Sequence, residues 1–327
     1  MGKYLIRRIL IIIPTLVLVI LLVFILVSLT PANPGRTILG LAATEEQVDQ
    51  LNEDLGYNRP MLVRYVDYLW NLVRGDMGVS YYNQSVKVFD KVMESLPYTL
   101  TLTGFSILVA VLIGVSLGIA CAVKQYSALD SIGSTVAMIM SSLPSFWVGI
   151  MLLLLFAQTL GWLPAGGVKS GFKSWILPVA IQGLIYAAQF LRYTRSAMLD
   201  QIQEDYVRTA RSKGCSEKRV VFGHALRNAL LTIITVIATN MGYMMGGSVV
   251  LESIFGIPGL GFIALEAILK RDIPIVLGAI LTIAILFMII MLVVDVLYAI
   301  IDPRIKAQYT RGKIKKKKPQ QLKTANQ

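Results

Sequence analysis

The chain has 327 residues, of which 55% are hydrophobic and only 15% are charged, and its formal net charge is +12. With a mean hydropathy of +0.66, this composition excludes an ordinary soluble globular protein and indicates a protein of the lipid membrane. The positive charge does not indicate nucleic-acid binding, because the basic residues are dispersed along the chain rather than gathered on one face with stacking aromatic side chains.

Six apolar stretches approach or exceed the length that an α-helix needs to cross a bilayer, roughly 20 residues. They comprise residues 9–29, 100–123, 132–160, 176–191, 230–250 and 275–301. The fourth stretch is short and the third and sixth are long, so we expect a tilt or a break in each of these three. The sequence therefore predicts an all-α protein with six transmembrane helices.

The orientation of these spans follows from the Lys and Arg residues, which collect on the cytoplasmic side of membrane proteins. With the N-terminus inside, 21 of the 31 Lys and Arg residues lie in inner segments and ten in outer segments. Six of those ten lie in one long outer loop that also carries nine Asp and Glu residues. We therefore expect both termini inside. Cys121 and Cys215 then lie at or beyond the inner face, where thiols stay reduced.

The chain divides into four parts by composition. They are the N-terminus with the first span (1–30), an extracytoplasmic subdomain (31–96), a five-helix core with a cytoplasmic loop at 192–229 (97–306), and a basic tail (307–327). In the subdomain, Thr44 and Gln47 are spaced as a capping box before one helix, and Pro60 is placed at the start of another.

The charged loop at 192–229 separates the fourth and fifth spans. Ile202, Tyr206 and Ala210 recur at four-residue spacing and predict a helix with one apolar edge. Gly214 is suited to end this helix, because glycine readily adopts the left-handed conformation found there. Ser216 is placed as the N-cap of a second short helix. Two short helices joined at a glycine would form a compact helical hairpin to which another protein can bind.

The same loop resembles a known signature. Residues 205–214 read DYVRTARSKG and residues 224–229 read HALRNA, which is similar to the loop of permease subunits of ABC importers in the peptide and nickel branch. Ala210, Gly214 and Leu226 also match the general pattern E-A-A-x3-G-x9-I-x-L-P of such permeases. Further motifs of this branch follow in order along residues 3–306, including Arg7-Arg8, Arg74-Gly75-Asp76, Leu143-Pro144-Ser145-Phe146-Trp147, Pro258-Gly259-Leu260-Gly261 and Asp302-Pro303-Arg304.

The resemblance implies a multi-pass permease subunit of the inner cell membrane. Its implied partners are a second homologous permease, two ATPase subunits and an extracytoplasmic substrate-binding protein. It also implies that the loop couples the permease to the ATPases, through Asp205, Tyr206, Arg208, Thr209, Ala210, Gly214, Ser216 and Glu217. We expect dipeptides or oligopeptides as the substrate, with nickel, glutathione or an oligosaccharide as alternatives. The sequence contains no nucleotide-binding P-loop, so we expect the ATPase on another chain, and we expect no cofactor and no metal.

Polar residues inside the apolar stretches are candidates for the translocation path, because a hydroxyl or amide facing lipid is costly while one facing a wet cavity is not. The candidates are Ser141, Ser142, Ser145, Gln182, Gln189 and Asn240. Local structure is the alternative: serines can satisfy a kink at Pro144, and the other polar groups can join packed helices. The glycine-rich segment 256–261 is either a re-entrant turn or an ordinary outer loop.

Two other classes of function fit less well. Ion-driven carriers usually hold several ionisable groups at mid-membrane and show inverted repeats, whereas Asp295 is the single acid deep in a span here and we find no repeat. We expect a structural role for Asp295. A membrane enzyme would need a nucleophile beside a base, and the only histidine, His224, has no acid placed to complete such a group.

Overall fold

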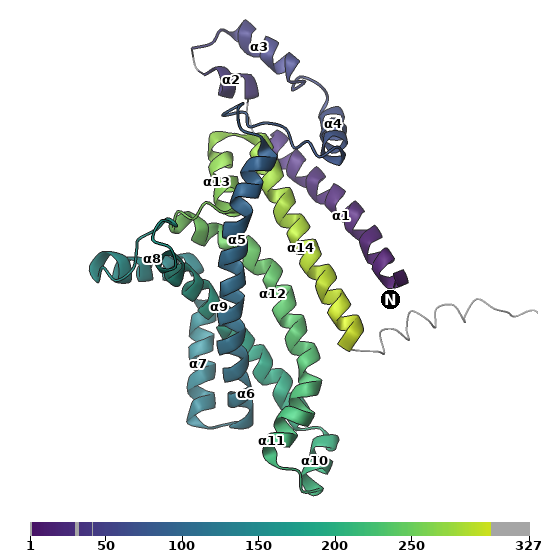
Figure 1. Ribbon diagram of the computed structural model, residues 1–327, viewed down its shortest axis with the longest axis vertical. Coiled ribbons are helices and arrows are strands. Elements are labelled where there is room, and N and C mark those ends of the chain that lie inside the picture. Colours follow the sequence, from purple (N-terminus) through teal and green to yellow (C-terminus); the bar gives the residue numbers. More distant parts are fainter. Residues whose placement is uncertain (1, 30–32, 41, 302–327) are drawn as a thin grey trace, which may run out of the picture.

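The computed structural model describes residues 2–29, 33–40 and 42–301, with side chains described from 10 to 296 within these ranges. In it the chain is an elongated helical bundle (Figure 1). Helices α2 (Pro34–Leu39) and α3 (Glu45–Asp54) lie at one end of the long axis, and α10 (Asp205–Ser212) and α11 (Glu217–Arg219) lie at the other. The predicted all-α class is confirmed. The basic tail and the motif at 302–304 lie outside the described residues.

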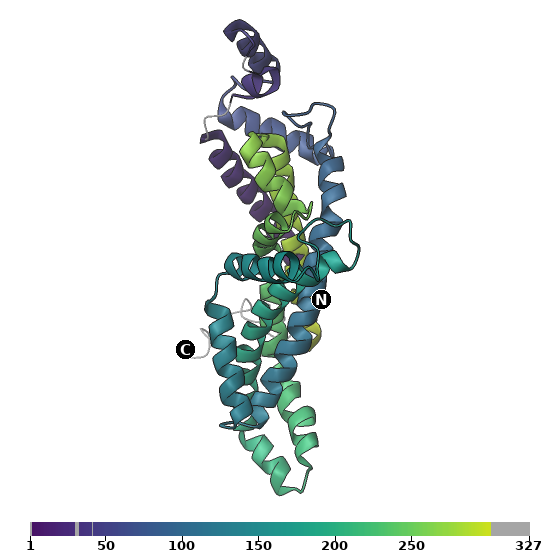
Figure 2. The same cartoon turned by 90° about the vertical axis from the view of Figure 1, so that its left-hand side faces the viewer.

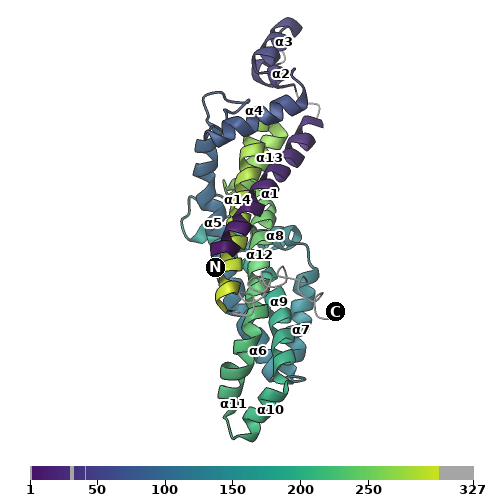
Figure 3. The ribbon, with the colours of Figure 1, turned by 90° about the vertical axis from the view of Figure 1, so that its right-hand side faces the viewer.

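Among the described residues, five helical runs are long and apolar enough to span a membrane. They are α1 (Gly2–Leu29), α5 (Val88–Ala110) with η1 (Val111–Val115) and α6 (Ser116–Val123), α9 (Lys173–Ile202), α11 with η3 (Val220–Ala225) and α12 (Leu226–Ile254), and α14 (Ile273–Ile301). α1 and α14 pack side by side (Figures 1 and 3). Asp295 is buried in α14, beside a cavity that α1 also lines.

The predicted third span is sharply bent. α7 (Ala128–Ser142) and α8 (Ser145–Leu153), which continues as the π-helical turn η2 (Leu154–Thr159), meet at 96°. Figures 1 and 2 show α8 lying across the long axis of the bundle. Pro144 causes the break, since it disfavours a helical conformation in the preceding Leu143, whose ψ is 132°. The pair makes a sixth span if the two halves are counted as one.

α9 is the central helix of the bundle and packs against α5, α6, α7, α8 and α12. Its close approach to η1 and α6 depends on two glycines. A Cβ on Gly114 would lie 2.4 Å from the carbonyl oxygen of Ala187, and one on Gly118 would lie 2.7 Å from Cβ of Thr194. α9 begins three residues before the predicted span and runs eleven residues past its end, where Ala197 and Met198 are buried in a cluster with Val207 and Val220.

The segment between α1 and α5 contains the short helices α2, α3 and α4. Thr44 and Gln47 form the predicted capping box: the Thr44 N–H donates to Gln47 Oε1 (3.0 Å) and the Gln47 N–H to Thr44 Oγ1 (3.3 Å). Helix α4 (Met61–Val73) begins after Pro60, as predicted. It lies across the end of the bundle in Figure 3, and its Tyr65 hydroxyl donates to the carbonyl of Val17 in α1 (2.7 Å).

Segment 256–261 is a short turn that leads into a further helix, α13 (Leu260–Lys270). α13 packs against α5, α12 and α14, with Leu260, Ile263 and Ala267 buried. The chain then turns at Arg271, which has φ +58°, and enters α14. The sequence suggested a turn here but not the packed helix that follows it.

Candidate coupling hairpin and substrate path

The charged loop forms a helical hairpin at the end of the bundle opposite α2 and α3 (Figures 1 and 3). Its first arm is α10, and its second arm, α11 and η3, continues into α12. Ile202 is the last residue of α9, and Glu204 is extended, with φ −69° and ψ 148°. The predicted single helix through Ile202, Tyr206 and Ala210 is therefore wrong, because the backbone bends after Ile202.

Gly214 ends α10 as predicted, with φ +80°. The Gly214 N–H donates to the carbonyl of Arg211 (2.9 Å) and the Cys215 N–H to that of Ala210 (3.2 Å), a pair of bonds that defines a Schellman motif. A Cβ on Gly214 would meet nothing within 4 Å, so backbone strain alone opposes a side chain there. Ser216 precedes α11 at the predicted N-cap position, but its hydroxyl makes no capping bond.

The inner side of the hairpin is apolar. Val207 and Ala210 of α10 are 0% and 7% exposed. They belong to a cluster that includes Met198 of α9 and Val220 and Val221 of η3. The small Ala210 side chain is thus buried within this chain, so it positions α10 rather than offering a contact to a partner.

The outer side of the hairpin is polar and open. Its exposed residues include most of the predicted coupling set, namely Asp205, Tyr206, Arg208, Thr209, Gly214, Ser216 and Glu217. The Arg211 guanidinium donates to both carboxylate oxygens of Glu217 (2.8 and 3.2 Å) and so ties the two arms together. The exposed pair of Arg208 with Asp205, at 3.9 Å, contributes little to stability.

A further ion pair, which sequence reasoning missed, fixes α7 against α9. Arg195 donates to Asp130 from Nε and from Nη2, the latter at 2.8 Å. Asp130 also accepts the N–H of Tyr126 at 3.0 Å, in the turn between α6 and α7. The two charged residues are 65 positions apart, and no local pattern in the sequence joins them.

Three of the path candidates bond to their own helices. The hydroxyls of Ser141 and Ser142 donate to the carbonyls four residues earlier (2.7 and 2.9 Å), and Asn240 Nδ2 donates to the carbonyl of Val236 (2.8 Å). These bonds satisfy the polar groups within their own helices. A role for these three residues in the translocation path stays a prediction.

The other three candidates lie on α8 and α9. Gln182 is buried and its Nε2 donates to the carbonyl of Met244 in α12 (2.8 Å), so it joins two helices inside the chain. Its Oε1 is among the few buried polar atoms that lack a partner in the described part of the chain. Ser145 and Gln189 are half-buried. Within the described residues, no hydrogen bond joins any two of the six candidates.

Glu252, near the end of α12, forms a buried polar junction that the sequence did not reveal. The residue is 0% exposed. Its carboxylate accepts the Thr99 hydroxyl (2.8 Å), the Ser248 hydroxyl (3.0 Å) and the Phe262 N–H (3.0 Å). Thr99 Oγ1 in turn accepts the N–H of Leu260 (2.8 Å). The carboxylate therefore caps the N-terminus of α13, where the helix dipole favours a negative charge, and links α5, α12 and α13.

This junction explains the glycines of the Pro258-Gly259-Leu260-Gly261 motif. A Cβ on Gly259 would lie 2.5 to 2.6 Å from the Glu252 carboxyl atoms, and one on Gly261 would lie 2.6 Å from Cα of Val249. Both distances are shorter than a Cβ can tolerate. An acid just after an apolar stretch, followed by spaced glycines, was the only sequence signal for the junction.

Comparisons with known proteins find similarity along almost the whole chain. The family model described as "Binding-protein-dependent transport system inner membrane component" matches residues 114–307, and the corresponding N-terminal model matches residues 1–103. The chain is 38% identical over 313 residues to a putative peptide transport system permease protein of Brucella abortus, with 94% of this chain and 99% of the relative covered. It is 39% identical over 306 residues to the glutathione transport system permease protein GsiC of Salmonella typhimurium, with the same coverage.

The fold is also similar to that of a solved transporter. An inward-facing structure of the MetNI methionine ABC transporter aligns with a TM-score of 0.57 and 16% sequence identity, covering 64% of this chain and 96% of the other. At this identity, the likeness shows a shared helical architecture.

Proposed function

The chain belongs to the family of inner membrane components of binding-protein-dependent transport systems, and on that premise we propose that it is the permease subunit of an ATP-driven importer of dipeptides or oligopeptides. The observation that carries the substrate class is the 38% identity, over 94% of the chain, to a putative peptide permease. Glutathione falls within the same class, because it is itself a short peptide, and the identity to GsiC favours it as a specific alternative.

Membership of the family implies ATPase and substrate-binding partners. We propose that the chain pairs with a homologous second permease, and that the ATPases are separate subunits that bind the exposed side of the α10–α11 hairpin. The continuity of residues Glu217–Ile254 as one helical run supports this assignment. Movement of the hairpin would be transmitted along that run to the junction at Glu252, at its far end.

The proposed orientation places the hairpin and both termini in the cytoplasm and the subdomain outside. In a Cys215→Ser background, Asn83→Cys should react with an impermeant maleimide added to intact cells, because Asn83 is exposed in the outer loop. Ser212→Cys, which is exposed in α10, should react only after the membrane is opened. Labelling of Ser212→Cys in sealed cells would reverse the orientation.

The function is tested by uptake into vesicles that contain this chain, its partner permease, both ATPases and the binding protein. A labelled dipeptide should accumulate when ATP is supplied on the hairpin side, and accumulation should stop when ATP is withheld. Excess glutathione should compete if the system takes glutathione as well. Uptake that follows an ion gradient and ignores ATP would instead identify an ion-coupled carrier and contradict the proposal.

A further inference from the structure

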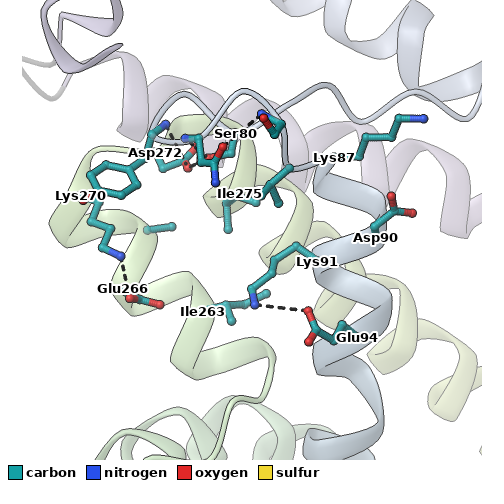
Figure 4. A pocket seen from close by; sticks show the side chains of 15 residues that line it. Ser80, Lys87, Asp90, Lys91, Glu94, Ile263, Glu266, Lys270, Asp272 and Ile275 are labelled. Carbon is teal, nitrogen blue, oxygen red and sulfur yellow. Dashed lines mark hydrogen bonds and ion pairs between the residues drawn. The ribbon is translucent and has the colours of Figure 1, made fainter. Parts of the chain in front are cut away.

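A cleft of about 600 Å³ opens between the outer loop, the first turns of α5 and the exposed side of α13 (Figure 4). Its inner surface includes the buried side chains of Ile263, Ala267 and Ile275. Asp272 fixes the loop beside it, by accepting the Tyr81 N–H (3.0 Å) and the Ser80 hydroxyl. The cleft is therefore walled by fixed elements, and its size is within the range of small-molecule sites.

The two walls of the cleft carry balanced charges. The lining residues include Lys87, Asp90, Lys91 and Glu94 on the α5 side and Glu266 and Lys270 on α13. Figure 4 shows Lys91 and Glu94 on the side of α5 that lies toward α13. On α13, Lys270 donates to Glu266 (2.8 Å), and its Nζ lies 4.7 Å from the ring centroid of Tyr82. The hydrogen bond to Glu266 raises the pKa of Lys270, so this ammonium stays charged at neutral pH.

On α5, Lys91 pairs with Glu94 at 3.4 Å. Lys87 and Asp90 make no ion pair within the described part of the chain. The cleft thus carries three ammonium groups and three carboxylates besides Asp272, which the loop occupies, and two of each are paired within their own wall. A cleft that carries equal numbers of charges of both signs suits a ligand that carries an ammonium group at one end and an anion at the other, rather than a simple anion or cation.

We propose that this cleft binds the charged ends of a peptide substrate, with the α-amino group at Asp90 and Glu94 and the α-carboxylate at Lys270. The proposal rests on the peptide importer function and on the outward orientation of the subdomain. It gives the permease a contact with substrate on the side where the binding protein releases it. The headgroup of phosphatidylethanolamine carries the same pair of charges, so the test separates a peptide from a lipid.

Saturation-transfer NMR tests the proposal by measuring how alanyl-phenylalanine binds to the full transporter complex without the binding protein. The complex is reconstituted in nanodiscs of phosphatidylglycerol and phosphatidylcholine, with or without phosphatidylethanolamine. Lys270→Gln should weaken binding of the dipeptide about tenfold, through loss of a charge-assisted hydrogen bond, and should not affect the C-terminal amide of the same peptide. Asp90→Asn should weaken binding of the dipeptide and leave binding of its N-acetyl form unchanged.

Two exposed residues away from the cleft, in the variants Lys169→Gln and Glu46→Gln, serve as controls and should change neither affinity. Equal binding of free and capped peptides, or unchanged binding by both cleft variants, would overturn the proposal. So would loss of peptide binding when phosphatidylethanolamine is present, since the lipid would then occupy the cleft. If one of these contrary results is found and the wild-type transporter still imports peptides, only the cleft assignment fails. If the wild-type transporter imports no peptide, the proposed function fails as well.

Discussion

Glu252→Ala should destabilise the permease strongly, because it removes the acceptor that pairs with the Thr99 hydroxyl and the Phe262 N–H inside the bundle. An unsatisfied buried donor costs about 1–3 kcal/mol, so we expect a loss of about 2–5 kcal/mol and a clearly lower melting temperature. Size-exclusion chromatography of the purified complex after heating measures this. Glu266→Ala, which removes a partly exposed acid of α13, is the matched control and should remain within about 0.5 kcal/mol of the wild type.

The contact between Glu252 and Gly259 can be isolated by a double-mutant cycle. Gly259→Ala alone should also destabilise the protein, because its Cβ would lie within 2.6 Å of the Glu252 carboxylate. In the double variant this collision is absent. The losses of unfolding free energy in the two single variants should therefore sum to more than the loss in the double variant. Strictly additive losses would show that the two residues do not meet.

Ala210→Glu should unfold the hairpin locally and release the ATPases. The new carboxylate would be buried without a partner in the cluster formed by Val207, Met198 and Val220, and an uncompensated buried charge costs several kcal/mol. The membrane-spanning helices should remain inserted, since their burial in lipid does not depend on this cytoplasmic hairpin. Gln203→Glu, which adds the same charge at an exposed position before α10 and outside the predicted coupling set, is the control for added charge.

Two measurements check the prediction for Ala210→Glu. The thiol of Cys215 packs against the same cluster, so its reaction with a maleimide should accelerate in Ala210→Glu and not in Gln203→Glu. The purified Ala210→Glu permease should also retain less ATPase than Gln203→Glu. Normal ATPase retention together with an unchanged Cys215 rate would show that α10 does not need this packing.

The sequence predicted the features that depend on local patterns. Apolar stretches located the spans because a bilayer requires about 20 apolar residues in a helix. The capping box at Thr44 and the helix end at Gly214 were predictable because each is decided by residues within one or two turns. The kink at Pro144 was also indicated, although its 96° angle was not, since tertiary packing sets the direction of the second half.

Features that join distant parts of the chain could not be predicted. The bonds from Asp130 to Arg195 and from Glu252 to Thr99 link positions 65 and 153 residues apart, and a single sequence contains no signal for such pairs. The same limit applies to Ala210 in the candidate hairpin. The family pattern indicated its importance, but only the packing shows that it faces Met198 and Val220 rather than a partner.

ATP hydrolysis by a Gly214→Val transporter is the most direct test of the central claim, that the hairpin couples this permease to its ATPases. Gly214 has φ +80° and open space around it, and Gly75 in the outer loop has φ +82° and the same open space. Valine at either position therefore introduces a similar backbone strain, on the order of 1–2 kcal/mol. We expect Gly75→Val to keep substrate-stimulated ATP turnover. Gly214→Val should insert at the normal level yet lose its ATPases or their stimulation. Equal, normal stimulation in both variants would contradict the coupling role.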